Sequence, residues 1–186
     1  MGTVLLLVRL NGKNRLSHIY TEEQRRRLVL FLFERMLKVL RGFDVYVGTP
    51  DDLAGEGFKI IKDEWKDINR VITRARKAVK DDILVLPCDL PFVEREDIEE
   101  LFNCGITIVP SQNGGTNALF LPADVDVVTQ FGENSFKKHV KGFECQGLDY
   151  RVVGSERFRD IDTEEDIAWV LEHGGECEFS RVIKEL

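Results

Sequence analysis

Short apolar runs alternate with amphipathic segments along the chain, and this alternation restricts the fold more than any other feature. Residues 3–9 form an apolar run of the kind expected for a central strand buried on both faces. Residues 22–40 carry apolar side chains at helical spacing, with Thr21 placed to cap the helix and Gly42 placed to end it. Strands separated by helices predict βαβ units. We therefore expect an α/β fold, namely a single-domain, Rossmann-like, doubly wound and mostly parallel sheet with helices on both faces.

The same patterns locate the remaining elements. Strands are predicted at residues 3–9, 44–48, 58–61, 83–86, 107–109, 118–121 and 150–153, and helices at residues 22–40, 67–79, 94–102, 135–140 and 163–171. No interdomain linker interrupts them, so we expect one domain over residues 1–186. The tail after Gly175 fits either a short strand or an arm that packs on a partner subunit.

Composition narrows the possible partners. The formal net charge is −7, which argues against broad binding to nucleic acid or to a membrane surface. An anionic substrate must therefore be held by local basic groups or by a metal ion. The four cysteines form no CxxC pair and do not cluster with the histidines, so reduced thiols in a cytoplasmic protein are expected. We expect no signal peptide, and the first apolar run is too short to span a bilayer.

The most informative loop is QNGGTNALF at residues 112–120. Two adjacent glycines let the backbone approach a ligand closely, and Thr116 adds a hydroxyl and an N–H group at the mouth of the turn. A donor-rich loop held by a strand is suited to a phosphate or a carboxylate. The same residues also suit an ordinary tight hairpin turn, so both interpretations stay open here.

Two further loops follow predicted strands, where an α/β sheet presents residues to ligands. The loop at residues 12–16 offers Lys13 and Arg15, which suit a polyphosphate, although it could be an ordinary solvated basic loop. Because both residues lie in a polar loop, we expect their removal to leave the fold intact. Asp89 lies between two prolines after the strand at 83–86, where it could hold Mg²⁺ or could simply form a turn or cap a helix.

Three other positions are weaker candidates. Ser135 follows Gly132 at an expected helix start, where it could face an anion or only cap the helix. Asp160 and Asp162 could both reach one cation, while Asp162 or Thr163 would also make a good helix cap. Asn69 opens a predicted helix and could contact the edge of a base or ribose.

Taken in order, these loops resemble the archaeal 2-phospho-L-lactate guanylyltransferase family, which acts in the biosynthesis of the deazaflavin coenzyme F420. The resemblance spans nearly the whole chain and rests on GKNRL, DINRVI, LPCDLPF, GGTNALF, GENSFKKH and DIDTEEDI. It implies a nucleotide-diphospho-sugar-transferase fold, often a homodimer, that uses GTP and Mg²⁺ and releases pyrophosphate. One departure is Arg9, which stands where the family usually has a lysine.

The resemblance also implies roles for individual residues. Lys13 and Arg15 would meet the triphosphate and, with Asp89, act in catalysis, and Asn69 would lie near the nucleoside. Asp89, Asp160 and Asp162 would hold the metal ion, whereas Thr116, Gly132 and Ser135 would hold the phosphorylated carboxylic acid. That acid could be phospholactate, phosphoenolpyruvate or 3-phosphoglycerate. Alternatives are nucleotidyl transfer to another phosphate, such as molybdopterin or a sugar phosphate, and a nucleotide-binding subunit without catalysis.

Overall fold

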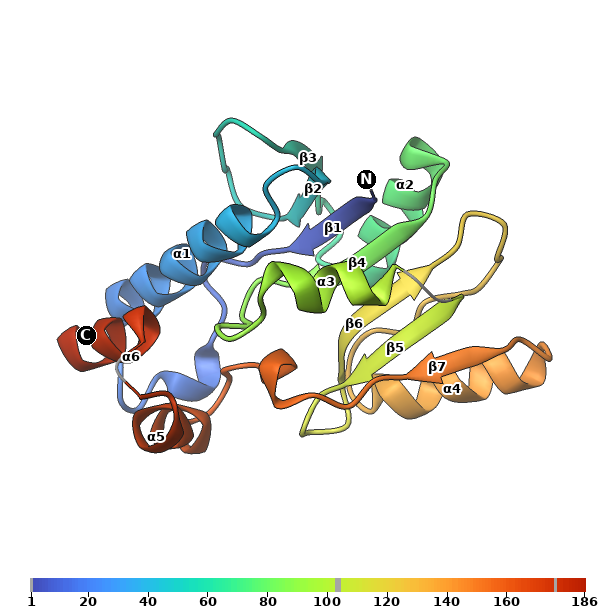
Figure 1. Cartoon of the computed structure of the whole chain (residues 1–186). Helices are drawn as coiled ribbons and strands as arrows, with labels where there is room; N and C mark the ends of the chain where they lie inside the picture. The colour runs from blue at the N-terminus through green and yellow to red at the C-terminus, as the bar shows by residue number, and fades with distance from the viewer. Residues whose placement is uncertain (1, 103–104, 176) are drawn as a thin grey trace.

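A computed structural model describes residues 2–102, 105–175 and 177–186 (Figure 1). Seven strands form one sheet in the order β3-β2-β1-β4-β6-β5-β7. The strands are β1 (Thr3–Leu7), β2 (Asp44–Thr49), β3 (Lys59–Lys62), β4 (Ile83–Pro87), β5 (Ile106–Pro110), β6 (Thr116–Leu121) and β7 (Tyr150–Val152). The α-helices are α1 (Glu22–Val39), α2 (Ile68–Val79), α3 (Arg95–Leu101), α4 (Ser135–Cys145), α5 (Glu164–His173) and α6 (Glu178–Glu185). Short 3₁₀ helices cover Asn14–Leu16 and Glu156–Phe158.

The sheet confirms the predicted doubly wound α/β fold. Alternate side chains of β1 enter opposite cores, since Val4 and Leu6 pack with α1 and α3 whereas Leu5 packs with α2. Helices α2 and α4 cover that second face, where Ile72 of α2 and Phe143 of α4 are buried. Helix α4 runs to Cys145, longer than the predicted 135–140, and thereby brings Phe143 into this core.

Among the strands of the described residues, β6 alone runs against both of its neighbours. It pairs antiparallel with both β4 and β5, while the pairs β1–β2, β1–β4, β2–β3 and β5–β7 are parallel. The turn between β5 and β6 spans only residues 111–115, which is too short for a parallel crossover. The glycine loop is therefore a hairpin turn. Its reversal puts Thr116, at the start of β6, on the same edge as the carboxyl ends of β1 and β4.

The tail after Gly175 differs from both predicted alternatives. It forms α6, in which Phe179 and Ile183 share one face and join a core cluster with α1 and α5. The Phe179 ring lies 6.0 Å from the ring of Phe31 and 6.4 Å from that of Phe92. The sequence carries no usual N-cap residue for α6, because Cys177, rather than serine or aspartate, accepts the capping hydrogen bond.

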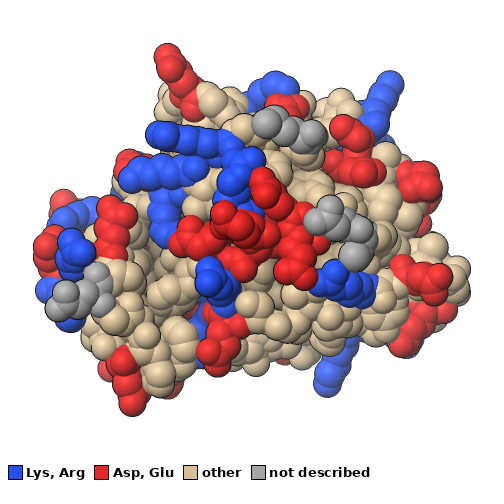
Figure 2. All heavy atoms as spheres, viewed as in Figure 1, with Lys and Arg blue, Asp and Glu red and all other residues tan. Residues whose placement is uncertain are grey.

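Charge on the viewed face is mixed in sign (Figure 2). Acidic side chains gather over α3, which contributes Glu96, Asp97, Glu99 and Glu100. No helix in the described part of the chain combines the length and the apolar character needed to cross a bilayer.

Helix α6 should stabilise the domain, because its buried face packs against α1 and α5. We expect Phe179→Ala to lower the free energy of unfolding by roughly 3–5 kcal/mol, because the ring is 2% exposed and the change would leave a cavity. Leu171→Ala in α5 is the control, since Leu171 is 44% exposed and should cost less than about 1 kcal/mol. Urea unfolding of both variants measures the difference, and equal losses would contradict the packing described here.

Candidate active site

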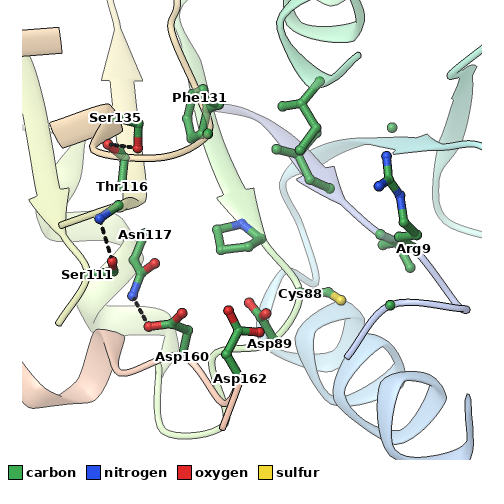
Figure 3. Close-up of a pocket in the computed structure, with 18 of the residues that line it drawn as sticks. Arg9, Cys88, Asp89, Ser111, Thr116, Asn117, Phe131, Ser135, Asp160 and Asp162 are labelled. Carbon is green, nitrogen blue, oxygen red and sulfur yellow. Dashed lines mark hydrogen bonds between the residues drawn. The ribbon is translucent and has the colours of Figure 1, made fainter. Parts of the chain in front are cut away.

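A cavity of about 630 Å³ lies along the carboxyl edge of the sheet (Figure 3). Its walls come from the loops after β1, β2, β3 and β4, from the β5–β6 hairpin and from the segments that precede α4 and α5. The structure brings nearly all the predicted site residues to this one cavity: Lys13, Arg15, Asp89, Thr116, Gly132, Ser135, Asp160 and Asp162.

The Lys13 side chain is buried, so the alternative of an ordinary solvated loop is wrong for this residue. The chain turns sharply after β1, Lys13 adopts a left-handed backbone with φ of 59°, and its side chain is only 7% exposed. The amine forms ion pairs with Asp89 and with Asp162, the latter at 2.6 Å. Removal of this side chain would leave both carboxylates without their cation, so the pairing argues against the prediction that its removal leaves the fold intact. Arg15 is exposed and also lines the cavity.

The lysine remains charged in this setting. Burial opposes the charge on Lys13, but the carboxylates of Asp89 and Asp162 outweigh that effect and hold its pKa above the usual range. The two carboxylates come from different segments, and the N–H of Ile161 donates to the carbonyl of Asp89 at 3.3 Å, which joins these segments directly. Asp89 therefore does not serve as a helix cap, and α3 is instead capped by Glu94.

Asp160 completes the acidic side of the cavity. Its Oδ1 accepts a hydrogen bond from Asn117 Nδ2 at 2.8 Å, and the same amide donates to the carbonyl of Phe158. Burial and, to a lesser degree, the charge of Asp89 raise the pKa of Asp160 to about 6. The helix cap of α5 is supplied by Thr163 with Asp166, so Asp160 and Asp162 are left to face the cavity.

The donor set suits a magnesium ion that is shared with phosphates. Oδ1 of Asp89 is buried and has no hydrogen-bond partner, which leaves a hard oxygen ligand available. Across the described residues, no three acidic, histidine or cysteine side chains form a ready-made metal cluster. Magnesium does not require one, because it commonly takes one or two carboxylates and completes its coordination with water and substrate phosphates.

Thr116 and Ser135 form a buried hydroxyl pair at the other side of the cavity. Ser135 Oγ donates to Thr116 Oγ1 at 3.1 Å, and His139 Nδ1 lies 3.1 Å from the same oxygen. Ser135 is the first residue of α4 rather than its cap, so the capping alternative is wrong.

The hydrogen-bond partners fix the protonation of His139. The N–H of Gln130 donates to Nε2 at 2.8 Å, so the ring proton lies on Nδ1 and is donated to Thr116. Burial, with a smaller contribution from Lys138, lowers the pKa of His139 to about 4, and the ring is neutral at pH 7. Thr116 Oγ1 thus accepts two hydrogen bonds, which leaves its own proton free to be donated to an anion in the cavity.

The segment before α4 passes the hairpin turn closely. Gly132 has φ of 131°, a conformation that favours glycine, and the N–H of Phe136 donates to the carbonyl of Gly114 at 3.2 Å. Asn69 does not line the cavity in this structure. Its side-chain amide instead donates to the carbonyl of Phe131 and accepts from the N–H of Phe131, so it anchors this segment.

The sequence analysis did not single out Asp63 or Asn117 as residues of this region. It also did not predict the contact between His139 and Thr116. Asn117 directly follows Thr116 in the glycine motif, so its position was available as a signal. Asp63 directly follows β3 and Asp89 is the second residue after β4, so both carboxylates come just after a strand. The contact between His139 and Thr116 joins residues 23 positions apart and could not be read from spacing.

Solved structures share the fold. A putative nucleotide-diphospho-sugar transferase from Desulfovibrio desulfuricans G20 aligns with a TM-score of 0.83 at 16% identity and covers 99% of this chain and 94% of its own. Rv0371C from Mycobacterium tuberculosis, solved in complex with manganese, aligns with a TM-score of 0.51 at 13% identity over 92% of this chain and 98% of its own.

Relatives identified by sequence similarity are named for particular guanylyltransferase activities, whereas the solved structures above show the fold alone. The 2-phospho-L-lactate guanylyltransferase of Methanocaldococcus jannaschii is 29% identical over 94% of this chain and 83% of its own length. The phosphoenolpyruvate guanylyltransferase of Roseiflexus castenholzii is 30% identical over 94% of this chain and 89% of its own. The sequence model of the family described as "Guanylyl transferase CofC like" matches residues 1–186. The chain therefore belongs to the family of CofC-like guanylyl transferases.

Proposed function

We propose that this protein joins GTP to 2-phospho-L-lactate, giving lactyl-2-diphospho-5′-guanosine and pyrophosphate, in the biosynthesis of coenzyme F420. The observation that carries the proposal is one cavity with two chemically distinct points. A buried cation is paired there with two carboxylates, beside the third carboxylate of Asp160, and a hydroxyl pair lies beside a glycine turn elsewhere in the cavity. The first arrangement suits a metal-bound triphosphate. The second suits a small anion that must approach it.

The reaction forms a bond between a phosphate oxygen of the acid and the α-phosphorus of GTP. The bond from that phosphorus to the oxygen of the β-phosphate breaks, and pyrophosphate leaves with the electron pair. The attacking oxygen is already ionised, so no general base is needed. Burial and the nearby Asp89 raise the pKa of the Cys88 thiol to about 12, so this cavity-lining cysteine is not a nucleophile either.

Charge repulsion between the two anions is the main barrier, and the protein lowers it by position and charge. Lys13 and Arg15 stabilise the negative charge that builds on pyrophosphate. Thr116, Gly132 and Ser135 hold the acid in line with the α-phosphate. When Mg²⁺ is bound, with Asp89 and with Asp160 or Asp162 as ligands, it supplies positive charge that favours attack at the α-phosphate. Contact between Asn69 and the nucleoside, a homodimer and a cytoplasmic location remain predictions.

Phosphoenolpyruvate is the second candidate acid, because the relative named for it is as similar to this chain as the phospholactate enzymes are. One assay separates the candidates. Purified protein with GTP and Mg²⁺ is given phospholactate, phosphoenolpyruvate or 3-phosphoglycerate, and pyrophosphate and product mass are measured. We expect the highest turnover with phospholactate. The turnover of a folded Asp89→Asn variant should be lower than that of the native protein by a factor of at least about a hundred. Product from none of the three acids would contradict the proposal.

Asp160 makes the stability of the metal-free protein depend on pH. Its folded pKa of about 6 exceeds the ordinary 3.8, so the stability that its proton provides is present below pH 3.8 and is lost as the pH rises through 6. Asp160→Asn keeps an acceptor for Asn117 and carries no charge. In EDTA, the variant should gain stability relative to the native protein between pH 4 and pH 7, by up to roughly 3 kcal/mol before solvent screening reduces it. A difference that does not change with pH would contradict this assignment.

Thr116 should act on the acid rather than on the nucleotide. Thr116→Val keeps the shape and removes the donor, so the KM for the acid should rise roughly tenfold to a hundredfold while the KM for GTP changes little.

His139 offers a matched pair of variants. His139→Asn can still donate toward Thr116, whereas His139→Gln can accept from Gln130 and loses that donor. We expect the Gln variant to impair acid binding more than the Asn variant. Equal effects on both substrates would make the network structural only.

A further inference from the structure

Asp63 is a buried carboxylate that the mechanism above does not use. It directly follows β3, its N–H donates to the carbonyl of Thr49 at 2.8 Å, and its side chain is 3% exposed. One oxygen, Oδ1, accepts the N–H groups of Trp65 at 3.2 Å and Asp67 at 3.0 Å, which shapes the loop before α2. The other oxygen, Oδ2, is not needed for that loop.

Oδ2 is left without a hydrogen bond among the described residues. Its ion-pair partner is Arg9, whose Nη2 lies 3.7 Å away, beyond hydrogen-bond distance, on a side chain that is 49% exposed. Both residues line the cavity. Figure 3 places Arg9 on the side of the cavity away from Thr116 and Ser135. Asp63 therefore belongs to the end of the cavity opposite the hydroxyl pair.

The walls around this end are mostly apolar. The cavity-lining residues there come from the ends of β1 and β2 and from α2, and they are Leu7, Val8, Pro50, Ile68 and Val71. An apolar slot with a few fixed polar groups suits a flat heterocycle. A phosphate would not be placed here, because the Asp63 carboxylate would repel it. The ribose hydroxyl groups could also donate to a carboxylate, but they would not match the apolar walls, so the base is the part of GTP that suits both features.

We infer that Asp63 Oδ2 reads the guanine base by accepting hydrogen bonds from its N1–H and N2 amino edge. The inference rests on the proposed use of GTP. Guanine is the purine nucleotide base with two adjacent donors on that edge, whereas adenine presents a ring acceptor beside one amino group. The guanidinium of Arg9 lies next to this carboxylate and can supply the donor that the guanine O6 needs.

The alternative is that Asp63 only shapes the loop before α2. Asp63→Asn separates the two roles, because its amide oxygen can still accept from Trp65 and Asp67 while an NH₂ group replaces Oδ2. That donor would face the donors of guanine. It would instead match xanthine, in which a 2-oxo group replaces the amino group.

The experiment measures equilibrium binding of GTP, xanthosine triphosphate and ATP, each with Mg²⁺ and without any acid. The native protein should prefer GTP, and Asp63→Asn should weaken GTP binding roughly 10- to 100-fold while tightening binding of xanthosine triphosphate, so that the preference inverts. Asp52→Asn is the control, because it removes the same charge from a fully exposed side chain in a nearby loop and should leave the preference unchanged.

Equal weakening of GTP and xanthosine triphosphate in Asp63→Asn would overturn the inference, as would a native protein with no preference for GTP. Melting temperature identifies a variant that fails to fold, and Asp63→Glu then serves as the second variant, which keeps the acceptor and should keep the preference for GTP. Failure of the proposed function would appear differently, as normal GTP preference in binding with no transfer of guanylyl to any acid.

Discussion

The buried ion pairs of Lys13 organise the active-site edge of this protein. They connect the loop after β1 to Asp89, 76 residues away, and to Asp162, 149 residues away. A buried ammonium group is tolerated only with close partners, so these loops are held in one arrangement. Three carboxylates lie around one ammonium group here, and burial, with a smaller contribution from the charges of Asp89 and Asp162, raises the pKa of Asp160. The cluster is therefore prepared for a further cation, which a metal-bound nucleotide would bring.

Sheet order explains why the cavity has two chemically different ends. Strands β3, β2 and β1 lie to one side of β4, while β6, β5 and β7 lie to the other. The reversed direction of β6 puts Thr116 at the carboxyl edge, where a parallel strand would have put the other end of β6. The hydroxyl pair of Thr116 and Ser135 thus lies on one side of Lys13 and its carboxylate partners, and the apolar end of the cavity beside Asp63 lies on the other side. Two anionic substrates can approach the same point from opposite directions.

Much of this was predictable from sequence because strands and helices here follow their hydrophobic periodicity. The apolar run of β1 and the capped stripe of α1 both form as predicted, and the loops after strands converge at one edge. Features set by long-range contacts were not accessible. The polarity of residues 12–16 left a solvated loop open as an alternative for Lys13, whereas partners far along the chain bury its side chain. Helix α6 was not predicted because its N-cap residue is a cysteine and because the helix, at 8 residues, is too short to show a clear apolar periodicity.

A crystal structure with both substrates bound tests most directly where they lie in the cavity. It would contain Mg²⁺, phospholactate and a GTP analogue whose α,β-bridging oxygen is replaced by methylene, so that pyrophosphate cannot leave. We expect the triphosphate to lie against Lys13 and Arg15, the guanine beside Asp63 and the phosphate of the acid beside Thr116. Guanine bound at the Thr116 end, or the acid bound outside the cavity, would contradict it.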